Sequence, residues 1–156
     1  MTTNPTIDAF WQAYLASLPA GAERPTTYQA WGFGDGPDMA DNLGHLVKTG
    51  IKTATCSLLW EYEADGEPVP QVGDFSVILD GAGQPLCVIE TIELEPKPYN
   101  QVEAQFAYDE GEGDRSLTYW REVHWQFFSR SCARIGREIS ETMPLLGERF
   151  RVVFAG

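Results

Sequence analysis

The sequence predicts an α+β fold, in which a small β-barrel or strongly curved sheet of about five or six short, mostly antiparallel strands is flanked by three or four helices. Three observations support this prediction. Short segments rich in Thr, Val, Ile and aromatic residues alternate with turn residues. Apolar residues at helical spacing occur before, between and after these segments. Tight turns join the middle strands, which leaves no room for parallel βαβ crossovers.

The N-terminal third predicts two helices separated by a loop. Asn4-Pro5 can cap and start the first helix, which Pro19-Ala20-Gly21 ends. A loop containing Trp31-Gly32-Phe33-Gly34-Asp35 follows. Gly36-Pro37 opens the second helix, and Gly50 stands where a helix end favours a left-handed residue.

The middle of the chain predicts three strands. Thr53–Tyr62 is rich in Thr, Leu and aromatic residues, which favours an extended conformation. Phe75–Leu79 and Pro85–Glu93 are separated by an Asp-Gly pair that is typical of a hairpin. Pro96 and Pro98 then break the strand pattern.

The C-terminal third predicts two more helices and a last strand. Residues 101–110 form a short helix, and 111–114 form a glycine-rich acidic loop. Ser116 can cap a longer helix. Residues 132–139 fit neither pattern, whereas 149–154 alternate in polarity and predict a strand.

Length and charge limit the possible functions. The chain has 156 residues, of which 43% are hydrophobic, and this suits one domain over residues 1–156. The net charge of −12 argues against nonspecific binding to duplex DNA or an anionic membrane. The net charge is compatible with a small basic pocket that binds a single nucleotide. No segment resembles a signal peptide or a membrane span.

The cysteines and histidines predict neither disulfides nor a metal centre. Three cysteines are present: Cys56, Cys87 and Cys132. Their odd number and spacing suggest reduced thiols in a cytoplasmic protein. His45 and His124, the two histidines, are far apart in sequence. We expect no cofactor, although the acidic stretch 109–114 leaves a divalent metal ion open. The sequence is silent on oligomeric state.

Lys52 is the first candidate for chemistry. It follows a helix-ending glycine and precedes an apolar strand, so desolvation would lower its pKa and let a neutral amine act as a base or nucleophile. Thr55 could face the same cavity in a Ser-Lys-like arrangement, with Thr53 and Ser57 on the same strand face. The alternatives are a solvated lysine that suits the helix dipole, and threonines present for strand propensity.

Glu110 is the second centre of interest. It lies four residues after Phe106 and three after Ala107, on the apolar face and at the C-terminal end of its predicted helix. Burial and the negative end of the helix would both raise the pKa of a carboxyl group, which suits general acid or base catalysis. The alternative is a solvated acidic loop, because Asp109 and Glu112 flank it.

Aromatic and basic side chains supply candidate substrate contacts. Trp31 and Phe33 lie in a glycine-rich loop, where an open ring could stack on an unpaired base, while the other aromatic residues fit a core. Arg121 and His124 are three residues apart on the longer helix, so we expect them to share a face. Arg121 could hold a phosphate or carboxylate, or else form a surface ion pair. The alternative for His124 is a histidine satisfied within its helix.

An ordered set of motifs runs through the chain. Gly50-x-Lys52-x-x-Thr55 stands at its centre, after Trp31-Gly32-Phe33-Gly34-Asp35. Phe106-Ala107-x-x-Glu110-Gly111-Glu112-Gly113 and Trp120-Arg121-x-x-His124 follow. This order resembles the ASCH domain, the activating-signal-cointegrator homology family.

The resemblance implies a PUA-like β-barrel, a cleft lined by the motif lysine, and action on RNA or its components. Some ASCH members resemble RNA-binding modules and some are ribonucleases. A shorter bacterial branch hydrolyses the acetyl amide of N4-acetylcytidine with a motif Lys, a motif Thr and a downstream Glu, which fall on Lys52, Thr55 and Glu110. Residues 1–24 would be an N-terminal helical extension.

Three functions stay open. An RNA-cleaving hydrolase would use Lys52 and Arg121 for charge and Glu110 for acid–base chemistry. An N4-acetylcytidine amidohydrolase would use Thr55 as nucleophile, Lys52 as its base, and Glu110 to protonate or orient the leaving group. A non-catalytic RNA-binding module would hold one base and one phosphate. We expect a hydrolase whose partner is an RNA, nucleoside or nucleotide ligand.

Overall fold

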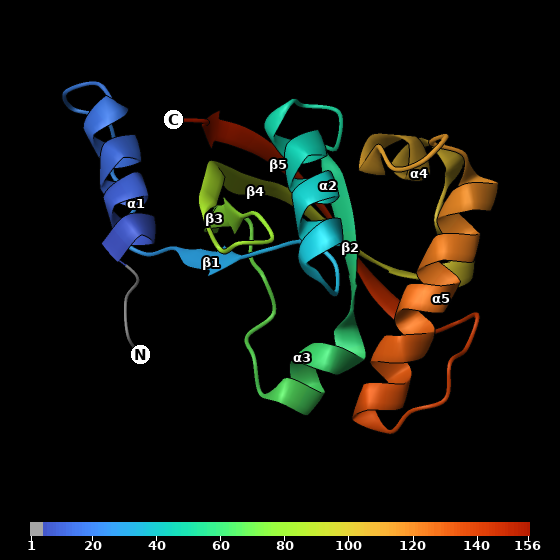
Figure 1. Ribbon diagram of the computed structural model, residues 1–156. Helices are drawn as coiled ribbons and strands as arrows, with labels where there is room; N and C mark the ends of the chain where they lie inside the picture. The colour runs from blue at the N-terminus through green and yellow to red at the C-terminus, as the bar shows by residue number, and fades with distance from the viewer. Residues whose placement is uncertain (1–4) are drawn as a thin grey trace. The chain divides into compact units, whose positions relative to one another are not determined.

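The computed structural model describes residues 5–156, so the cap predicted at Asn4 lies outside the described residues. Figure 1 shows the helices and strands. In chain order they are α1 (Pro5–Ser17), β1 (Gln29–Trp31), α2 (Pro37–Lys48), β2 (Ala54–Leu58), α3 (Leu59–Asp65), β3 (Phe75–Leu79), β4 (Pro85–Pro98), the 3-10 turn η1 (Tyr99–Gln101), α4 (Ala104–Glu110), α5 (Leu117–Ile135) and β5 (Pro144–Phe154).

The strands form one mixed sheet with the order β1-β3-β4-β5-β2. β3 pairs antiparallel with β4, and β2 pairs antiparallel with β5, whereas β1 pairs parallel with β3. The expected α+β class with mostly antiparallel strands is therefore confirmed. Contacts divide the chain into two compact units, each with its own core.

The first unit contains the described residues up to Gly50, together with Gly73–Thr91 and Phe150–Gly156. Its strand β3 is buried on both faces, because Val77 and Ile78 point to opposite sides of the sheet. Val77 packs in a cluster with Trp11 of α1, and Ile78 packs in a cluster with Val47 of α2. Each fully buried aliphatic side chain of this kind stabilises the fold by about 1.5–3 kcal/mol.

The second unit contains Ile51–Val72 and Ile92–Arg149. Its apolar core includes Leu58 of β2 and Trp120 and Phe128 of α5. Helices α4 and α5 lie side by side in Figure 1, and a short loop joins them. The predicted cap is confirmed, because the Ser116 side-chain oxygen accepts a hydrogen bond from the backbone N–H of Tyr119 at 3.1 Å.

The strand predicted at Thr53–Tyr62 is too long at its C-terminal end. Strand β2 stops at Leu58, and α3 begins at the next residue and ends at Gly66, whose φ of 65° is left-handed. The Leu and aromatic residues that suggested a strand here lie in a short helix with Glu61 and Glu63. Helix-favouring glutamates and a glycine cap outweigh the weaker β-propensity of the aromatic residues.

Two strands extend beyond their prediction, and one was not predicted. The sequence around Gln29–Trp31 was expected to be a loop, but it forms β1, whose parallel pairing with β3 depends on residues distant in sequence. β4 continues through Pro96 to Pro98. The φ angle of proline fits an extended strand, and each proline removes only one backbone hydrogen-bond donor from it. β5 begins at Pro144, five residues before the predicted start.

α5 resolves the segment that the sequence left ambiguous. Residues 132–135 complete the helix, and Gly136 ends it with a φ of 73°. None of the helices in residues 5–156 is both long enough and apolar enough to cross a lipid bilayer.

Candidate functional site

Lys52 is the buried centre of a polar cluster in the second unit. Its side chain is 1% exposed, although the neighbouring Ile51 and Thr53 are exposed. The Nζ atom donates to the Ala54 carbonyl oxygen at 2.9 Å and to the Glu110 side chain at 3.0 Å. It also donates to Glu112 Oε2 at 3.0 Å. One ammonium group thus ties the start of β2 to the end of α4 and to the loop after it.

Glu110 is held from three sides. Its Oε1 atom accepts from Lys52, and its Oε2 atom accepts a short hydrogen bond from the indole Nε1 of Trp120. The Nε2 atom of His124 lies 3.6 Å from Oε2. With a side chain 1% exposed, Glu110 is a fixed, fully partnered carboxylate.

These contacts reverse the pKa directions expected from burial alone. Burial would lower the pKa of Lys52, but the carboxylates of Glu110 and Glu112 outweigh it and raise the pKa above its ordinary value. Burial would raise the pKa of Glu110, but the Lys52 charge and then His124 bring it well below the ordinary value. Lys52 is therefore an ammonium ion and Glu110 a carboxylate at neutral pH, against the expected neutral amine and raised carboxyl pKa.

His124 is the member of the cluster that titrates nearest to neutral pH. Its Nδ1 atom lies 2.8 Å from the Trp120 carbonyl oxygen, which can only accept, so Nδ1 carries hydrogen. Burial would lower the pKa of His124, but the Glu110 carboxylate raises it above the ordinary 6.5. The ring stacks on Trp120 with centroids 4.2 Å apart, which fixes its orientation.

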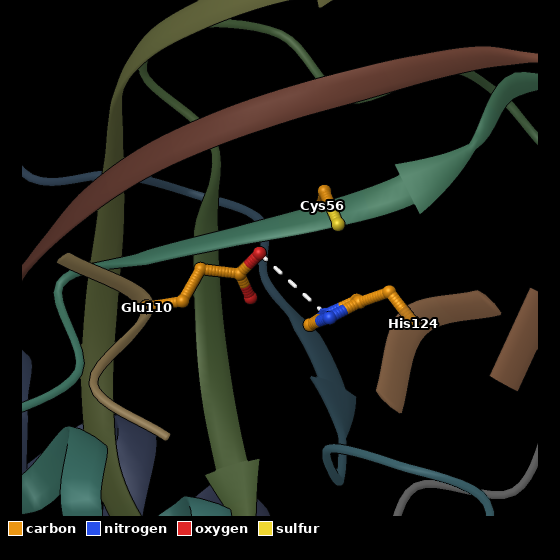
Figure 2. A group of neighbouring side chains, drawn as sticks. All are labelled: Cys56, Glu110 and His124. Atoms are coloured by element: carbon orange, nitrogen blue, oxygen red, sulfur yellow. Dashed lines mark ion pairs between the residues drawn. The ribbon is translucent and has the colours of Figure 1, made fainter. Parts of the chain in front are cut away.

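Cys56 completes a group of three possible metal ligands. Figure 2 shows its thiol on β2 and the side chains of Glu110 and His124 converging. The possible ligand atoms of the three residues all lie within 4.8 Å of one another. Thiolate, carboxylate and imidazole are ligands that zinc accepts. However, both Glu110 oxygens already accept hydrogen bonds, and the Lys52 ammonium supplies a positive charge beside them. Burial and then Glu110 also raise the pKa of the Cys56 thiol well above its ordinary value. The donor set therefore fits a metal ion poorly.

Thr55 lies on the other face of β2. Because side chains alternate along a strand, Thr55 and Ser57 point away from the face that carries Cys56. Thr55 stands opposite the buried Glu148 of β5, and the Ser57 hydroxyl accepts from Tyr62 at 2.8 Å. The structure thus brings Lys52 and Glu110 together, but puts Thr55 on the opposite side of the strand from Glu110.

Two further candidates, Thr53 and Arg121, lie outside the buried cluster. Thr53 is exposed and binds the Asp109 carbonyl oxygen through its backbone N–H at 2.9 Å, which ties β2 to α4. Arg121 is exposed whereas His124 is buried, so the two do not present one common face. This corrects the expectation from their three-residue spacing, because a helix that is buried along one stripe separates such neighbours at its edge.

Trp31 and Phe33 belong to the first unit. Phe33 is 4% exposed in the cluster with Val47 and Phe150, so the expected open ring is wrong for this residue. Trp31 is half-buried on β1 and meets the Phe33 ring edge-on at 4.5 Å. The flanking glycines serve close packing instead of an open loop, since a Cβ at Gly34 would lie 2.5 Å from Met39.

Glu112 and Trp120 are further functional candidates that the structure adds to the cluster. Both residues stand in the ordered motifs, and Glu112 also lies in the acidic stretch 109–114, but neither was assigned a role of its own. The signal for Glu112 was its position between two glycines directly after the Glu110 helix. Its side chain is 13% exposed, so it is the acidic partner of Lys52 that solvent reaches.

A pocket of about 110 Å³ opens beside Cys56 in the same unit. Val102, Phe106 and Leu145 give it an apolar wall, and charged residues such as Lys97 line it as well. It is smaller than the roughly 300 Å³ at which pockets for drug-sized ligands begin. Its lining includes Cys56 but not Lys52, Glu110, Glu112 or His124.

A family model for the ASCH domain matches residues 29–154. The chain belongs to the ASCH domain family. The crystal structure of an ASCH domain from Lactobacillus crispatus JV V101 is 37% identical, with a TM-score of 0.92 over 99% of this chain and 98% of that chain. A crystal structure from Enterococcus faecalis V583 is 36% identical, with a TM-score of 0.86 over 96% of this chain and 89% of that chain. A search of curated proteins finds no significant match.

These matches confirm the resemblance and the α+β, PUA-like fold expected from the sequence. The ASCH match covers every member of the buried cluster, from Lys52 to His124. In this ASCH domain the motif lysine is not an isolated side chain. It is the cation of a closed network with Glu110, Glu112 and His124.

Proposed function

We propose that this ASCH protein is a hydrolase that acts on a modified nucleoside or a short RNA at the cluster of Lys52, Glu110, Glu112 and His124. The observation that carries the proposal is the burial of Lys52, Glu110 and His124 together in one unit, with the partly exposed Glu112 beside them. Desolvating charges is costly, so such clusters are enriched at functional sites. PUA-like domains are associated with RNA, which gives the substrate class.

In the proposed reaction the cluster supplies charge and one mobile proton. Lys52 stabilises negative charge that develops on an acyl or phosphoryl oxygen. His124 acts as general acid or base, because its pKa is raised from 6.5 and it titrates nearest the working pH. Glu110 positions both cations. Water serves as the nucleophile, since Thr55 lies on the opposite strand face from Cys56.

A small substrate is favoured over long RNA. The net charge of −12 repels a polyanion. We therefore propose amide hydrolysis of N4-acetylcytidine as the first reaction to test, with RNA cleavage second. In the amide reaction His124 takes a proton from the water that attacks the acetyl carbonyl, the carbon–nitrogen bond breaks, and His124 returns the proton to the departing N4 amine, which leaves acetate and cytidine.

The test is to incubate the protein with N4-acetylcytidine and, separately, with single-stranded RNA that contains it, and to follow both by mass spectrometry. Wild type should release acetate from the nucleoside, and Lys52→Met and His124→Asn should lose at least about 100-fold in rate. The control is Glu122→Gln, at an exposed glutamate on α5. Strand scission without acetate release would favour RNA cleavage. Binding without turnover of either substrate would overturn the hydrolase in favour of a binding module.

A further inference from the structure

Every hydrogen of the Lys52 ammonium group is already committed. An ammonium carries three N–H donors, and Nζ lies within 3.4 Å of four oxygens. These are the carbonyl oxygens of Ala54 and Glu110 and one carboxylate oxygen each of Glu110 and Glu112. A ligand oxygen can therefore reach Nζ only if one of these acceptors leaves.

The acceptors differ in how easily they can leave. The Ala54 carbonyl is part of the buried strand β2, and its residue is 0% exposed. The Glu110 side chain is 1% exposed and is also held by Trp120. The Glu112 side chain is 13% exposed, and Lys52 is its ion-pair partner. Glu112 is the acceptor that can exchange at the lowest cost.

The exchange requires only a side-chain rotation, because the backbone of the loop is fixed on both sides of Glu112. At Gly111, φ is 75° and an added Cβ would lie 2.7 Å from the Ile51 carbonyl oxygen. At Gly113, φ is 58° and an added Cβ would overlap the Tyr119 ring. Both positions need glycine, so the loop lies closely against its neighbours. After rotation, the Glu112 carboxylate would stay beside the bound ligand.

From this geometry we propose that Glu112 occupies the position of a ligand oxygen on Lys52, and that the ligand is a small molecule presenting an anionic or strongly polar oxygen. The proposal rests on the proposed functional site but not on its turnover. A carboxylate or phosphate oxygen replaces the Glu112 oxygen with no change of charge at Lys52. A ligand without such an oxygen would leave the buried ammonium short of an acceptor.

The number of lysines allows a direct test. The chain has three, at positions 48, 52 and 97, so the side-chain ε-CH2 signals of isotopically labelled lysine can be assigned by substitution. Wild type, Glu112→Gln and Glu122→Gln are titrated with sodium acetate and, separately, with inorganic phosphate while these NMR signals are recorded. The two probes distinguish a carboxylate from a phosphate as the preferred oxygen.

We expect the Lys52 signal to shift with one of the probes, while those of Lys48 and Lys97 stay unchanged. Glu112→Gln should bind that probe about tenfold more tightly than wild type, because it removes the competing charge, and Glu122→Gln should match wild type. Equal affinity in Glu112→Gln and wild type, or a Lys52 signal that moves with neither probe in either protein, would overturn the proposal. Glu112→Ser, with its thermal unfolding recorded, repeats the test if the Gln variant does not fold.

The readout separates this proposal from the hydrolase. If Glu112→Gln binds the probe no more tightly than wild type while N4-acetylcytidine is still hydrolysed, only the proposed role of Glu112 is contradicted. An intact exchange without turnover would contradict the hydrolase and leave the ligand site standing.

Discussion

The second unit contains two ionic clusters, one buried and one exposed, and each pairs one cation with two carboxylates. One cluster joins Lys52 to Glu110 and Glu112, with Lys52 and Glu110 each 1% exposed. The other joins Arg134, near the end of α5, to Glu61 and Asp65 of α3 at 2.7 and 2.9 Å. Arg134 is 51% exposed, so water screens its pairs.

The geometry of the exposed cluster is the better of the two, yet the buried cluster has the larger consequences. Arg134 makes a bidentate contact with Asp65 through two nitrogens. Its ions are nevertheless solvated whether or not they pair. Lys52 and Glu110 have left water, so each depends on the other for its charge state. Burial, and not hydrogen-bond geometry, indicates which cluster can do chemistry.

The largest effect should come from removing the buried cation. Lys52→Met leaves the buried Glu110 and the partly exposed Glu112 without their cation. We expect the free energy of unfolding to fall by about 3–5 kcal/mol. Urea denaturation measures this change. The double variant with Glu110→Gln should recover part of the loss. Strict additivity of the two single losses would show that the ions are not coupled, and would remove the basis of the comparison.

The next effect concerns the indole that holds Glu110. Trp120→Phe keeps an aromatic ring but removes the Nε1 donor, so we expect a loss of about 1.5–3 kcal/mol in unfolding free energy, typical of a hydrogen bond to a charged group. Trp125→Phe is the matched control. Trp125 lies on the same helix as Trp120, and its ring packs against the ring of Tyr99. Equal losses in the two variants would mean that the hydrogen bond to Glu110 adds nothing.

A smaller effect should follow pH. The folded-state pKa of His124 is raised above 6.5, so its pairing with Glu110 stabilises the protein fully below pH 6.5. That contribution is lost as pH rises through the folded-state pKa. Denaturation of wild type and His124→Asn at intervals from pH 6 to pH 9 should show a stability difference that shrinks with rising pH. The exposed His45→Asn serves as control. A constant difference would contradict the pairing.

The smallest effect should come from the exposed cluster. Arg134→Ala removes its contacts to Glu61 and Asp65, but all three side chains are solvated in either state. We expect a thermal unfolding midpoint within experimental error of wild type, and unchanged N4-acetylcytidine turnover. A clear drop in the midpoint would show that surface geometry matters more than burial in this unit.

The family resemblance named Lys52 and Glu110 as members of one working set, but the sequence could not show that the two side chains meet or what their charge states would be. The helical wheel placed Glu110 on the apolar face of its helix, and Lys52 was expected at the start of an apolar strand. The direction of each pKa depended on the partner at 3.0 Å, which spacing along the chain does not reveal. Burial and the helix end could be predicted from the sequence, whereas the opposite charge beside each group could not.

It was harder to predict which side chains of β2 point toward Glu110. Side chains alternate along a strand, so the choice between Thr55 and Cys56 as the neighbour of Glu110 depends on a single residue of register. Likewise, β1 has three residues and exists through its parallel pairing with β3, which no local pattern encodes. Local signals predicted the helix caps at Ser116 and Gly50 well, because those contacts involve near neighbours in sequence.

The enclosure of Lys52 also affects how the protein would respond to chemical labelling. Amine-acylating reagents attack the neutral form of an accessible lysine, and Lys52 is both charged and 1% exposed. Lys48 is exposed and the Lys97 side chain is 25% exposed, so these two should be modified first. The extent of acylation at Lys52 relative to Lys48 would then report whether the buried network is intact in any preparation or variant, before a substrate has been identified.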